Sequence, residues 1–329
     1  MNWKNRKVLV TGGAGFIGSN LCDALLAAGA RVVALDDLSI GKRENLKQAE
    51  QLGLEFVQGT ILEPETWSGH LREVTHVFHL AVACLRRSFH QPMVVHEINA
   101  TGTLAVLEAC RRHSPRLERF LYCSSSEIYG TAQHAPMDEH HPLRPTTVYG
   151  ASKLAGEVYT LAAELPVTVA RPFNTYGARE HHEGASGEVI PRFVVRIANG
   201  LAPMIFGDGA QTRDFTHVSD TARGLMLAAE RPEGLGQVLN LARGQEVSVA
   251  RIAELLLSKM GRSDLRPEFR GARPADVDRH FADTSKARQL LGFEARLDIE
   301  SGLDRYLEWF QETHPQAGRL LEDVQDQNW

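Results

Sequence analysis

The sequence predicts an α/β protein in which a doubly wound parallel sheet is followed by a smaller mixed C-terminal domain. Short runs of apolar and β-branched residues alternate with helical patterns through the first half of the chain, and the first run leads into a glycine-rich turn. Beyond about residue 175 this alternation weakens, and the loops become richer in glycine, proline and charge. Such alternation favours an open parallel sheet with helices on both faces.

The first βαβ unit has the pattern of a Rossmann-type dinucleotide site. An apolar run at residues 7–11 leads into a G-x-x-G-x-x-G turn at residues 12–18, and a helical pattern follows. Glycines in such a turn let the backbone approach a pyrophosphate, which rests on the helix N-terminus. The second strand, at residues 31–36, ends in Asp36, whose carboxylate can bind the adenosine ribose and repel a 2′-phosphate. The sequence therefore predicts NAD rather than NADP.

Further elements follow in the same order. Four more runs suit strands that are buried on both faces, at residues 54–58, 75–80, 119–124 and 167–171. Helical patterns lie between them, notably at residues 94–112 and 148–165. Ligands of open parallel sheets bind outside the carboxyl ends of the strands, so the motifs at these ends are expected to share one site.

The domain boundary is placed near residue 175. Residues 1–175 form the predicted NAD-binding domain and residues 176–329 the smaller domain, with return segments to the first expected within residues 215–245. The tail from residue 312 is mostly polar, and we expect it to be loosely ordered. The helices expected in the second part lie at residues 189–199, 219–230, 249–259 and 303–311.

Composition argues against several classes. A formal net charge of −5 gives no basic footprint for nucleic acid. No apolar run reaches the ~18 residues of a membrane span, and the first strand begins too early to leave room for a signal peptide. The four cysteines form no C-x-x-C pair, which favours reduced cytoplasmic thiols over disulfides or zinc. The histidine pairs at residues 140–141 and 181–182 are interpreted as surface residues, so no metal site is predicted.

Tyr149 and Lys153 carry the strongest indication of chemistry. A spacing of four residues places both side chains on one face of a helix. There an ammonium can lower the pKa of a phenol, which is ordinarily about 10, so that the tyrosine can accept and return a hydroxyl proton. Such pairs are common on helices, and this one gains weight from the dinucleotide pattern before it.

The chain resembles the extended short-chain dehydrogenase/reductases, in particular the nucleotide-sugar epimerase/dehydratase group. The resemblance extends from the glycine turn to about residue 276. Its motifs are T-G-G-A-G-F-I-G at 11–18, H-L-A at 79–81, Asn99, S-S-S-E-I-Y-G at 124–130, Y-G-A-S-K at 149–153, R-P-F-N at 171–174 and R-D-F at 213–215. The resemblance implies a bound NAD that is reduced and reoxidised within one turnover, a nucleotide-sugar-binding C-terminal domain, and a homodimer formed through the helices at 94–112 and 148–165.

Carried over to the matching positions, the resemblance gives individual residues their roles. Tyr149 would be the general base at a sugar hydroxyl, most often that of C4, Lys153 would hold the nicotinamide ribose and lower the tyrosine pKa, and Ser125 would hydrogen-bond the same hydroxyl. NAD would be bound by Gly12, Gly15, Phe16, Ile17, Gly18, Asp36, Asp37, Leu80, Ala81, Asn99, Tyr149 and Lys153. The substrate, a nucleotide-diphosphate sugar with UDP favoured, would be bound by Arg86, Asn174, Val189, Arg213, Arg273 and Asp276.

Glu127 leaves the outcome at the sugar open. Sugar 4,6-dehydratases and uronate decarboxylases frequently have a glutamate at this position, where it can remove the C5 proton once C4 is a ketone. Glu127 can equally be a loop acid without a chemical role. Inversion at C4 needs only Tyr149, Lys153, Ser125 and a cavity in which the 4-keto sugar can rotate. We favour a UDP-hexose 4-epimerase, with a 4,6-dehydratase or uronate decarboxylase as the alternative, and a non-catalytic NAD-binding regulator as a remote one.

Overall fold

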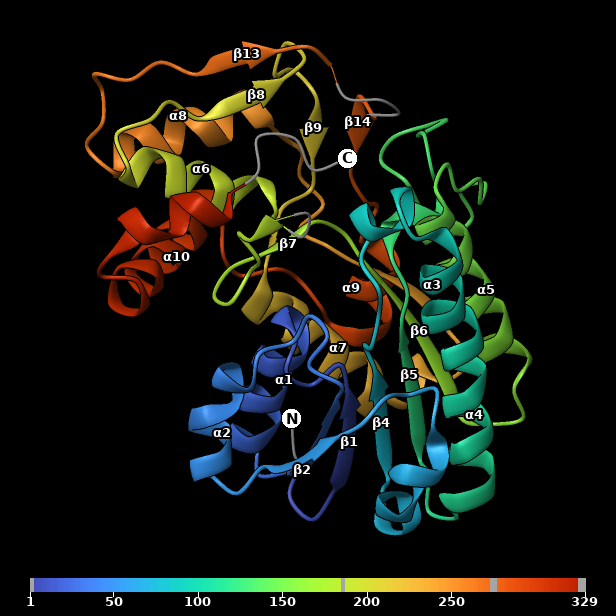
Figure 1. Cartoon of the computed structure of the whole chain (residues 1–329). Coiled ribbons are helices and arrows are strands. Elements are labelled where there is room, and N and C mark those ends of the chain that lie inside the picture. Colours follow the sequence, from blue (N-terminus) through green and yellow to red (C-terminus); the bar gives the residue numbers. More distant parts are fainter. Residues whose placement is uncertain (1–2, 185–186, 273–276, 325–329) are drawn as a thin grey trace.

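A seven-stranded parallel sheet forms the centre of the computed structural model, which describes residues 3–184, 187–272 and 277–324 (Figure 1). The strand order is β11-β6-β5-β4-β1-β2-β3, so the direction of winding reverses between β1 and β4. This confirms the predicted doubly wound sheet, whose ligands bind at the point of reversal. The strands are β1 (Lys7–Thr11), β2 (Arg31–Asp36), β3 (Glu55–Gln58), β4 (His76–His79), β5 (Arg119–Cys123), β6 (Val167–Pro172) and β11 (Val238–Leu241).

Alternate residues of the central strands supply the two faces of the sheet. Val8 and Val10 of β1 pack into one hydrophobic cluster, whereas Leu9 between them packs into another. Leu9 lies opposite Val33 of β2 and Val77 of β4, and both belong to the same cluster as Leu9. Because both faces are covered, the strands read as nearly continuous apolar runs in the sequence.

Helices cover both faces of the sheet (Figure 1). The cluster around Val8 contains side chains of α1, α2, α7 and α9, and α1 packs directly against α7. The opposite cluster contains α4, which packs on α5. Their bounds are α1 (Phe16–Ala27), α2 (Lys47–Gln51), α4 (Gly102–His113), α5 (Val148–Ala162), α7 (Val218–Glu230) and α9 (Ser285–Leu291).

The helix expected at residues 94–112 is interrupted. Its chain forms α3 (Pro92–His96), a π-helical turn η5 (Glu97–Thr101) and then α4. The interruption coincides with Asn99, whose side chain is committed to bonds outside the helix. A π-turn inserts one extra residue per turn and commonly lies near a functional site. Periodicity alone cannot detect so local a change.

The C-terminal half has its own hydrophobic cluster, formed mainly by α6 (Val189–Ala198), α8 (Val249–Lys259) and α10 (Ile299–Thr313). Ser248 caps α8 and Asp298 caps α10 by accepting from backbone N–H groups. The tail expected to be loose instead forms η9 (Ala317–Asp323), and Leu320 and Leu321 pack against this cluster. The short strands are β7 (Thr175–Tyr176), β8 (Met204–Phe206), β9 (Thr212–Arg213), β10 (Thr216–His217), β12 (Val247–Ser248), β13 (Glu268–Arg270) and β14 (Arg279–His280).

The chain crosses more than once between the two halves. After α6 and β8–β10, the segment that contains α7 and β11 joins the central sheet, where β11 pairs with β6. Among the described residues, no helix is both long enough and apolar enough to cross a membrane. The remaining helical turns are η1 (Arg43–Leu46), η2 (Pro64–Thr66), η3 (Ser68–Glu73), η4 (Arg86–Phe89), η6 (Ser126–Ile128) and η8 (Pro232–Gly234).

Candidate active site

A cavity of about 510 Å³ lies at the carboxyl ends of the sheet strands and continues into the C-terminal half. The glycine turn after β1 lines one end, and residues of β8 and β9 line the other. Most of the expected site residues therefore share one space. Those on its wall are Gly12, Gly15, Phe16, Ile17, Gly18, Asp36, Asp37, Leu80, Ala81, Arg86, Ser125, Glu127, Tyr149, Lys153, Asn174, Val189 and Arg213.

The turn contains four glycines, and at Gly12 and Gly18 neighbouring backbone leaves no room for a side chain. Gly12 has φ +69°, and a Cβ there would lie 2.8 Å from the backbone nitrogen of Ala81. A Cβ at Gly18 would overlap the carbonyl oxygen of Gly12. Gly15 is the N-cap of α1, which has no side-chain cap and no acidic residue in its first turn. The N-terminus of α1 is thus suited to receive the pyrophosphate of NAD.

Asp36 is held by the backbone around the glycine turn. Its Oδ2 accepts from the Ala14 N–H at 2.9 Å, and its Oδ1 accepts from the Leu38 N–H at 2.9 Å. Burial raises the pKa of Asp36, and these two N–H groups oppose the increase. Because Asp36 also lines the cavity, its remaining lone pairs can accept from ribose hydroxyls.

A buried network positions the chain that follows β4. The Thr103 hydroxyl donates to a carbonyl oxygen of the π-helical turn at 2.6 Å, so it can accept from His79 Nε2 at 3.0 Å. His79 Nδ1 then accepts from the Thr11 hydroxyl at 2.7 Å, and Thr11 Oγ1 accepts from the N–H groups of residues 80–81. Burial lowers the pKa of His79 to about 3, so the ring is neutral. The network fixes the backbone beside the glycine turn.

Asn99 lies behind the cavity wall rather than on it. Its Oδ1 accepts from the Ala83 N–H at 2.8 Å, and its Nδ2 donates to the Ala83 carbonyl at 3.1 Å and to Ser152 Oγ at 3.0 Å. These bonds are structural, and the expected contact of Asn99 with NAD stays a prediction. Asn99 joins the loop after β4 to α5, the helix that carries Tyr149.

Tyr149 and Ser125 are brought together from α5 and the end of β5. Tyr149 lies in the first turn of α5, which Thr147 caps by accepting from the Gly150 N–H at 3.0 Å. The Tyr149 phenol hydrogen-bonds with the Ser125 hydroxyl. Burial raises the pKa of Tyr149, and this hydrogen bond lowers it in part. The two hydroxyl groups can therefore exchange a proton with a ligand hydroxyl in the cavity.

Lys153 lies one helical turn beyond Tyr149. Its Nζ donates to the Cys123 carbonyl at 2.6 Å and lies 4.4 Å from the centroid of the Tyr122 ring. Burial lowers the pKa of Lys153 to about 8. Burial is the largest influence on the pKa of Tyr149 and raises it. The expected lowering of that pKa by Lys153 stays a prediction.

Arg86 is paired across the cavity with Glu188, the N-cap residue of α6. Its Nη1 and Nη2 donate to the two Glu188 carboxylate oxygens at 2.7 and 3.0 Å. Burial alone would lower the pKa of Arg86, but Glu188 outweighs it and raises that pKa, with a smaller contribution from Glu127. The Arg86 guanidinium, expected to bind substrate, is thus already engaged. No local pattern in the sequence identifies Glu188 as the partner of Arg86.

Three expected substrate-binding residues lie around the other half of the cavity. Asn174 follows β6, and its Oδ1 is buried without a hydrogen-bond partner in the part of the chain that the structure describes. Arg213 donates from Nη1 to the carbonyls of Thr212 at 2.8 Å and Val277 at 2.6 Å. Val189 is the first residue of α6. Arg273 and Asp276 lie outside the described residues.

The histidine pairs differ from expectation. His141 and His182 are buried, whereas both pairs were expected at the surface. His141 Nε2 accepts from the Gln133 N–H at 3.0 Å, and the His182 ring packs against that of His314. Their burial follows from contacts distant in sequence. Within the described residues, no group of three or more histidine, cysteine or acidic side chains could hold a metal ion.

Comparison with known proteins defines the class. Residues 8–242 match the NAD dependent epimerase/dehydratase family. The chain is 36% identical over 314 residues to a UDP-glucose 4-epimerase of Mycolicibacterium smegmatis, covering 93% of this chain and 98% of that one. The structure of the epimerase Mth375 from Methanothermobacter thermautotrophicus has a TM-score of 0.90 at 35% identity, covering 96% of this chain and 95% of that one. The dTDP-glucose 4,6-dehydratase DesIV of Streptomyces venezuelae, solved with NAD, has a TM-score of 0.86 at 29% identity and covers 94% and 98%.

The chain thus has the sheet and the cofactor site of an NAD-dependent enzyme. It belongs to the NAD-dependent epimerase/dehydratase family, within the extended short-chain dehydrogenase/reductases. The relatives include both epimerases and dehydratases, so family membership establishes the chemistry only to that level.

Proposed function

We propose that the protein inverts C4 of a nucleotide-diphosphate hexose, with a UDP-hexose favoured. The main support for the proposal is the shared cavity. Its wall extends from the glycine turn and Asp36, past Tyr149, to Arg213. A dinucleotide and a nucleotide sugar can therefore meet at the tyrosine. The similarity to a UDP-glucose 4-epimerase over nearly the whole chain supports the same reaction.

The residues around the sugar would divide the chemistry. Tyr149 would take the proton of the C4 hydroxyl at its phenol oxygen and later return it, while Ser125 would hold the same oxygen. Lys153 would bind the nicotinamide ribose with its ammonium. NAD, when bound, accepts a hydride and gives it back, and its positively charged nicotinamide ring favours the phenolate form of a nearby tyrosine. Asn174 and Arg213 would bind the nucleotide diphosphate, and Val189 would line the substrate site. Arg273 and Asp276 would contribute from outside the described residues.

Ser126 favours inversion over dehydration. Loss of water from C6 requires an acid that protonates the leaving hydroxyl as well as a base at C5. Glu127 can be such a base, but its neighbour Ser126 has no titratable proton, and His280 Nε2 lies 3.3 Å from the Ser126 carbonyl oxygen. Burial lowers the pKa of His280 to about 4, so this ring is neutral and a poor acid.

A second candidate function rests on Glu127. Its carboxylate lines the cavity and lies close enough to Tyr149 to raise the pKa of the phenol, which supports a role beside the reacting carbons. In a 4,6-dehydratase or a uronate decarboxylase, such a group would act after C4 is oxidised. The second candidate therefore makes Glu127 essential, whereas inversion does not.

Glu127→Gln separates the two candidates. For a 4-epimerase, we expect a modest loss of activity and no solvent deuterium at C5 of the product in heavy water, because the hydride leaves and returns at C4. For a dehydratase, the wild type would label C5 and lose water, and the variant would accumulate NADH and a 4-keto sugar. Nuclear magnetic resonance of the product and NADH absorbance measure both. Labelled, dehydrated product from the wild type would overturn the epimerase assignment.

Asp36→Ala tests the cofactor end. We expect weaker NAD binding and less discrimination against NADP, because the carboxylate both accepts from the ribose and repels a 2′-phosphate. Titration of both cofactors into cofactor-stripped protein gives the ratio of their dissociation constants. Asp208→Ala is the matched control, since Asp208 does not line the cavity and accepts from the Ala210 N–H. An unchanged ratio in Asp36→Ala would remove Asp36 from cofactor selection.

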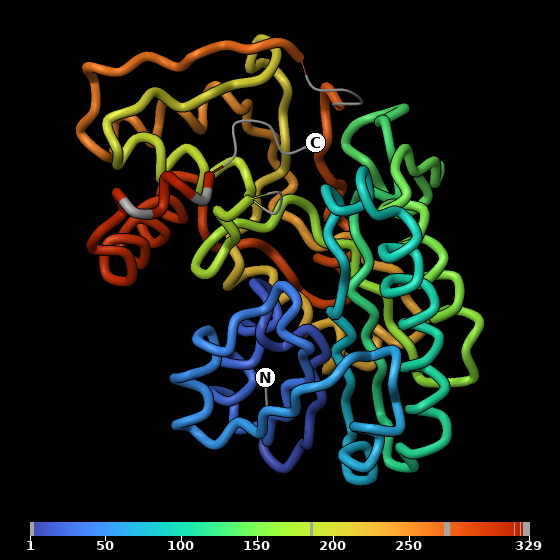
Figure 2. Tube along the Cα trace, in the orientation of Figure 1, coloured from blue at the N-terminus to red at the C-terminus, as the bar shows by residue number. Residues whose placement is uncertain are grey.

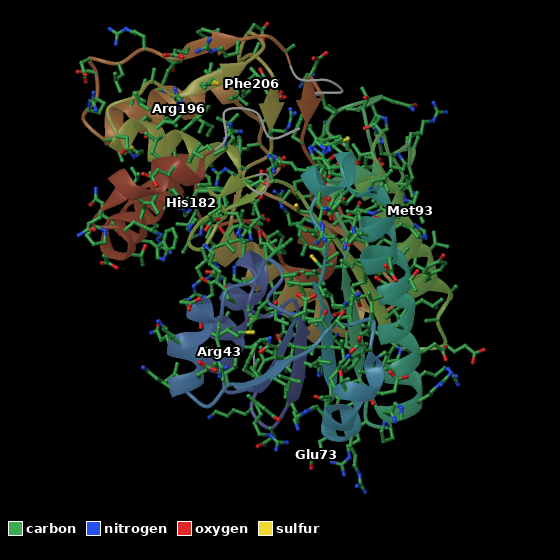
Figure 3. All side chains as sticks on the ribbon, viewed as in Figure 1. Arg43, Glu73, Met93, His182, Arg196 and Phe206 are labelled. Atoms are coloured by element: carbon green, nitrogen blue, oxygen red, sulfur yellow. The ribbon has the colours of Figure 1, made fainter. Side chains whose placement is uncertain are left out.

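We further propose a cytoplasmic homodimer. The support for a dimer is the exposed apolar surface of α4 and α5, on which Leu104, Val158 and Leu161 are 46%, 53% and 43% exposed. Met93 of α3, labelled in Figure 3, adds to it at 76% exposed. Side chains of this kind are commonly covered by a partner. The support for a reducing compartment is that none of the four cysteines, all of which the structure describes, forms a disulfide.

A further inference from the structure

Residues 177–184, which we term the bridging loop, leave the C-terminal half and reach the dinucleotide end of the cavity. The loop follows β7, and the chain continues to α6. Figure 2 shows it as the yellow-green segment that descends toward the blue α1. Among the described residues, three side-chain contacts join it to the NAD-binding half. No motif in the sequence indicates them.

Two of the contacts are made to α1. Asn20 Nδ2 donates to the Ala178 carbonyl at 3.0 Å, and Arg179 forms an ion pair with Asp23 at 2.7 Å. Arg179 has φ +71°, a left-handed conformation that a non-glycine residue adopts only when its surroundings enforce it. The bridging loop is therefore held in a specific path across the helix whose N-terminus faces the cavity.

The third contact lies beside the glycine turn. Lys42 Nζ forms an ion pair with the Glu183 carboxylate, and the backbone N–H of Lys42 donates to the Ala14 carbonyl at 3.0 Å. Ala14 is the residue whose own N–H binds Asp36. Glu183 thus connects the bridging loop to the same backbone that would hold the ribose and the pyrophosphate.

The bridging loop is also anchored in the half from which it comes. The His182 ring packs edge-to-face on His314, which follows α10. Figure 3 labels His182 on this loop. The next residue back, His181, lines the cavity, and burial lowers its pKa so that its ring is neutral. The loop therefore spans the cavity between two fixed points and presents His181 to its interior.

We propose that the bridging loop retains NAD in the protein between turnovers. It contacts the middle of α1 at Asn20 and Asp23, on the helix whose N-terminus would receive the pyrophosphate. These contacts and the Lys42–Glu183 pair must break before the two halves separate there. A cofactor reoxidised in place has no need to leave, so slow release is compatible with turnover; in this respect the inference rests on the proposed function. The contacts act on the NAD dissociation rate rather than on the chemical step.

Charge exchange tests the Lys42–Glu183 contact. We expect Lys42→Glu and Glu183→Lys each to speed NAD dissociation roughly two- to fivefold, the usual range for a partly exposed ion pair, and the double variant to restore the wild-type rate. The rate is measured by trapping labelled NAD released from the holoprotein with excess unlabelled NAD. Arg43→Glu is the charge-matched control, because Arg43 pairs with Glu50 in its own segment at 3.0 Å.

Removing all three contacts gives the larger effect. In Asn20→Ala/Lys42→Ala/Arg179→Gly, with glycine chosen to suit the left-handed backbone, we expect roughly tenfold faster NAD dissociation from a protein that still unfolds cooperatively. Wild-type dissociation from this variant, or an equal acceleration in Arg43→Glu, would overturn the inference. The proposed function is tested separately. If these variants release NAD as expected but the enzyme inverts no nucleotide sugar, the proposed function is wrong and the role of the bridging loop still holds.

Discussion

Tyr149→Phe should lower turnover by roughly two to four orders of magnitude while leaving NAD bound. The ring keeps its place in the first turn of α5, but the group that accepts the sugar hydroxyl proton is gone. Ser125 remains, and without its phenol partner it has no base to which it can pass a proton. Steady-state rates and the NAD content of the purified variant measure the two parts of this expectation.

Tyr159→Phe is the matched control for this variant. Tyr159 lies on the same helix, is 37% exposed and does not line the cavity, so its hydroxyl should be dispensable. A Tyr149→Phe enzyme with near-normal turnover would remove Tyr149 from the mechanism. A Tyr149→Phe protein that had lost its NAD would instead mean that the phenol serves cofactor binding.

Glu157→Ala should destabilise the fold by about 3–5 kcal/mol, because it leaves a buried guanidinium without its counter-charge. Glu157 of α5 and Arg171 of β6 form an ion pair at 2.5 Å, and their side chains are only 2% and 3% exposed. Arg171 also donates to the Tyr129 hydroxyl at 2.8 Å, and that hydroxyl donates to Asn240 of β11 at 2.7 Å. The pair thus joins α5 to two strands directly beneath the cavity.

Denaturant unfolding measures the loss, and Glu254→Ala is the control. Glu254 pairs with Arg251 on the surface of α8, where both side chains are more than half exposed, and exposed pairs contribute little. If Glu157→Ala lowered the free energy of unfolding as little as Glu254→Ala does, the result would show that solvent reaches Arg171. Arg171 opens the R-P-F-N motif, so the buried pair gives that residue a structural reason to be arginine.

The sequence predicted those features that depend on neighbouring residues. The glycine turn, Asp36 at the end of the second strand, and the Tyr149–Lys153 spacing each depend on a short local pattern, and the parallel strands were recognisable because both faces are buried. The sequence did not predict the π-helical turn that interrupts the helix at 94–112. The turn coincides with the bonds of Asn99 to Ala83 and Ser152, and the apolar periodicity of the helix does not reveal these bonds.

Contacts between distant segments account for the other differences. Arg86 pairs with Glu188, which is 102 positions further along the chain, so no local pattern could predict the pair. Binding of substrate by Arg86 stays a prediction. The polar tail was expected to be loose, yet Leu320 and Leu321 find apolar partners on the C-terminal cluster. His182 was placed at the surface because its partner His314 cannot be inferred from the residues around it. Contacts of this kind can be identified only in the folded structure, because their partners are distant in the sequence.

The product of UDP-glucose turnover tests the proposed inversion most directly. The enzyme would be incubated with UDP-glucose and excess NAD, and the nucleotide sugars would be separated by chromatography and weighed by mass spectrometry. Inversion at C4 predicts a second nucleotide sugar of unchanged mass, identified as the C4 epimer by nuclear magnetic resonance, with no net accumulation of NADH. A product lighter by one water would contradict this account, as would loss of carbon dioxide from UDP-glucuronic acid without C4 inversion of any UDP-hexose.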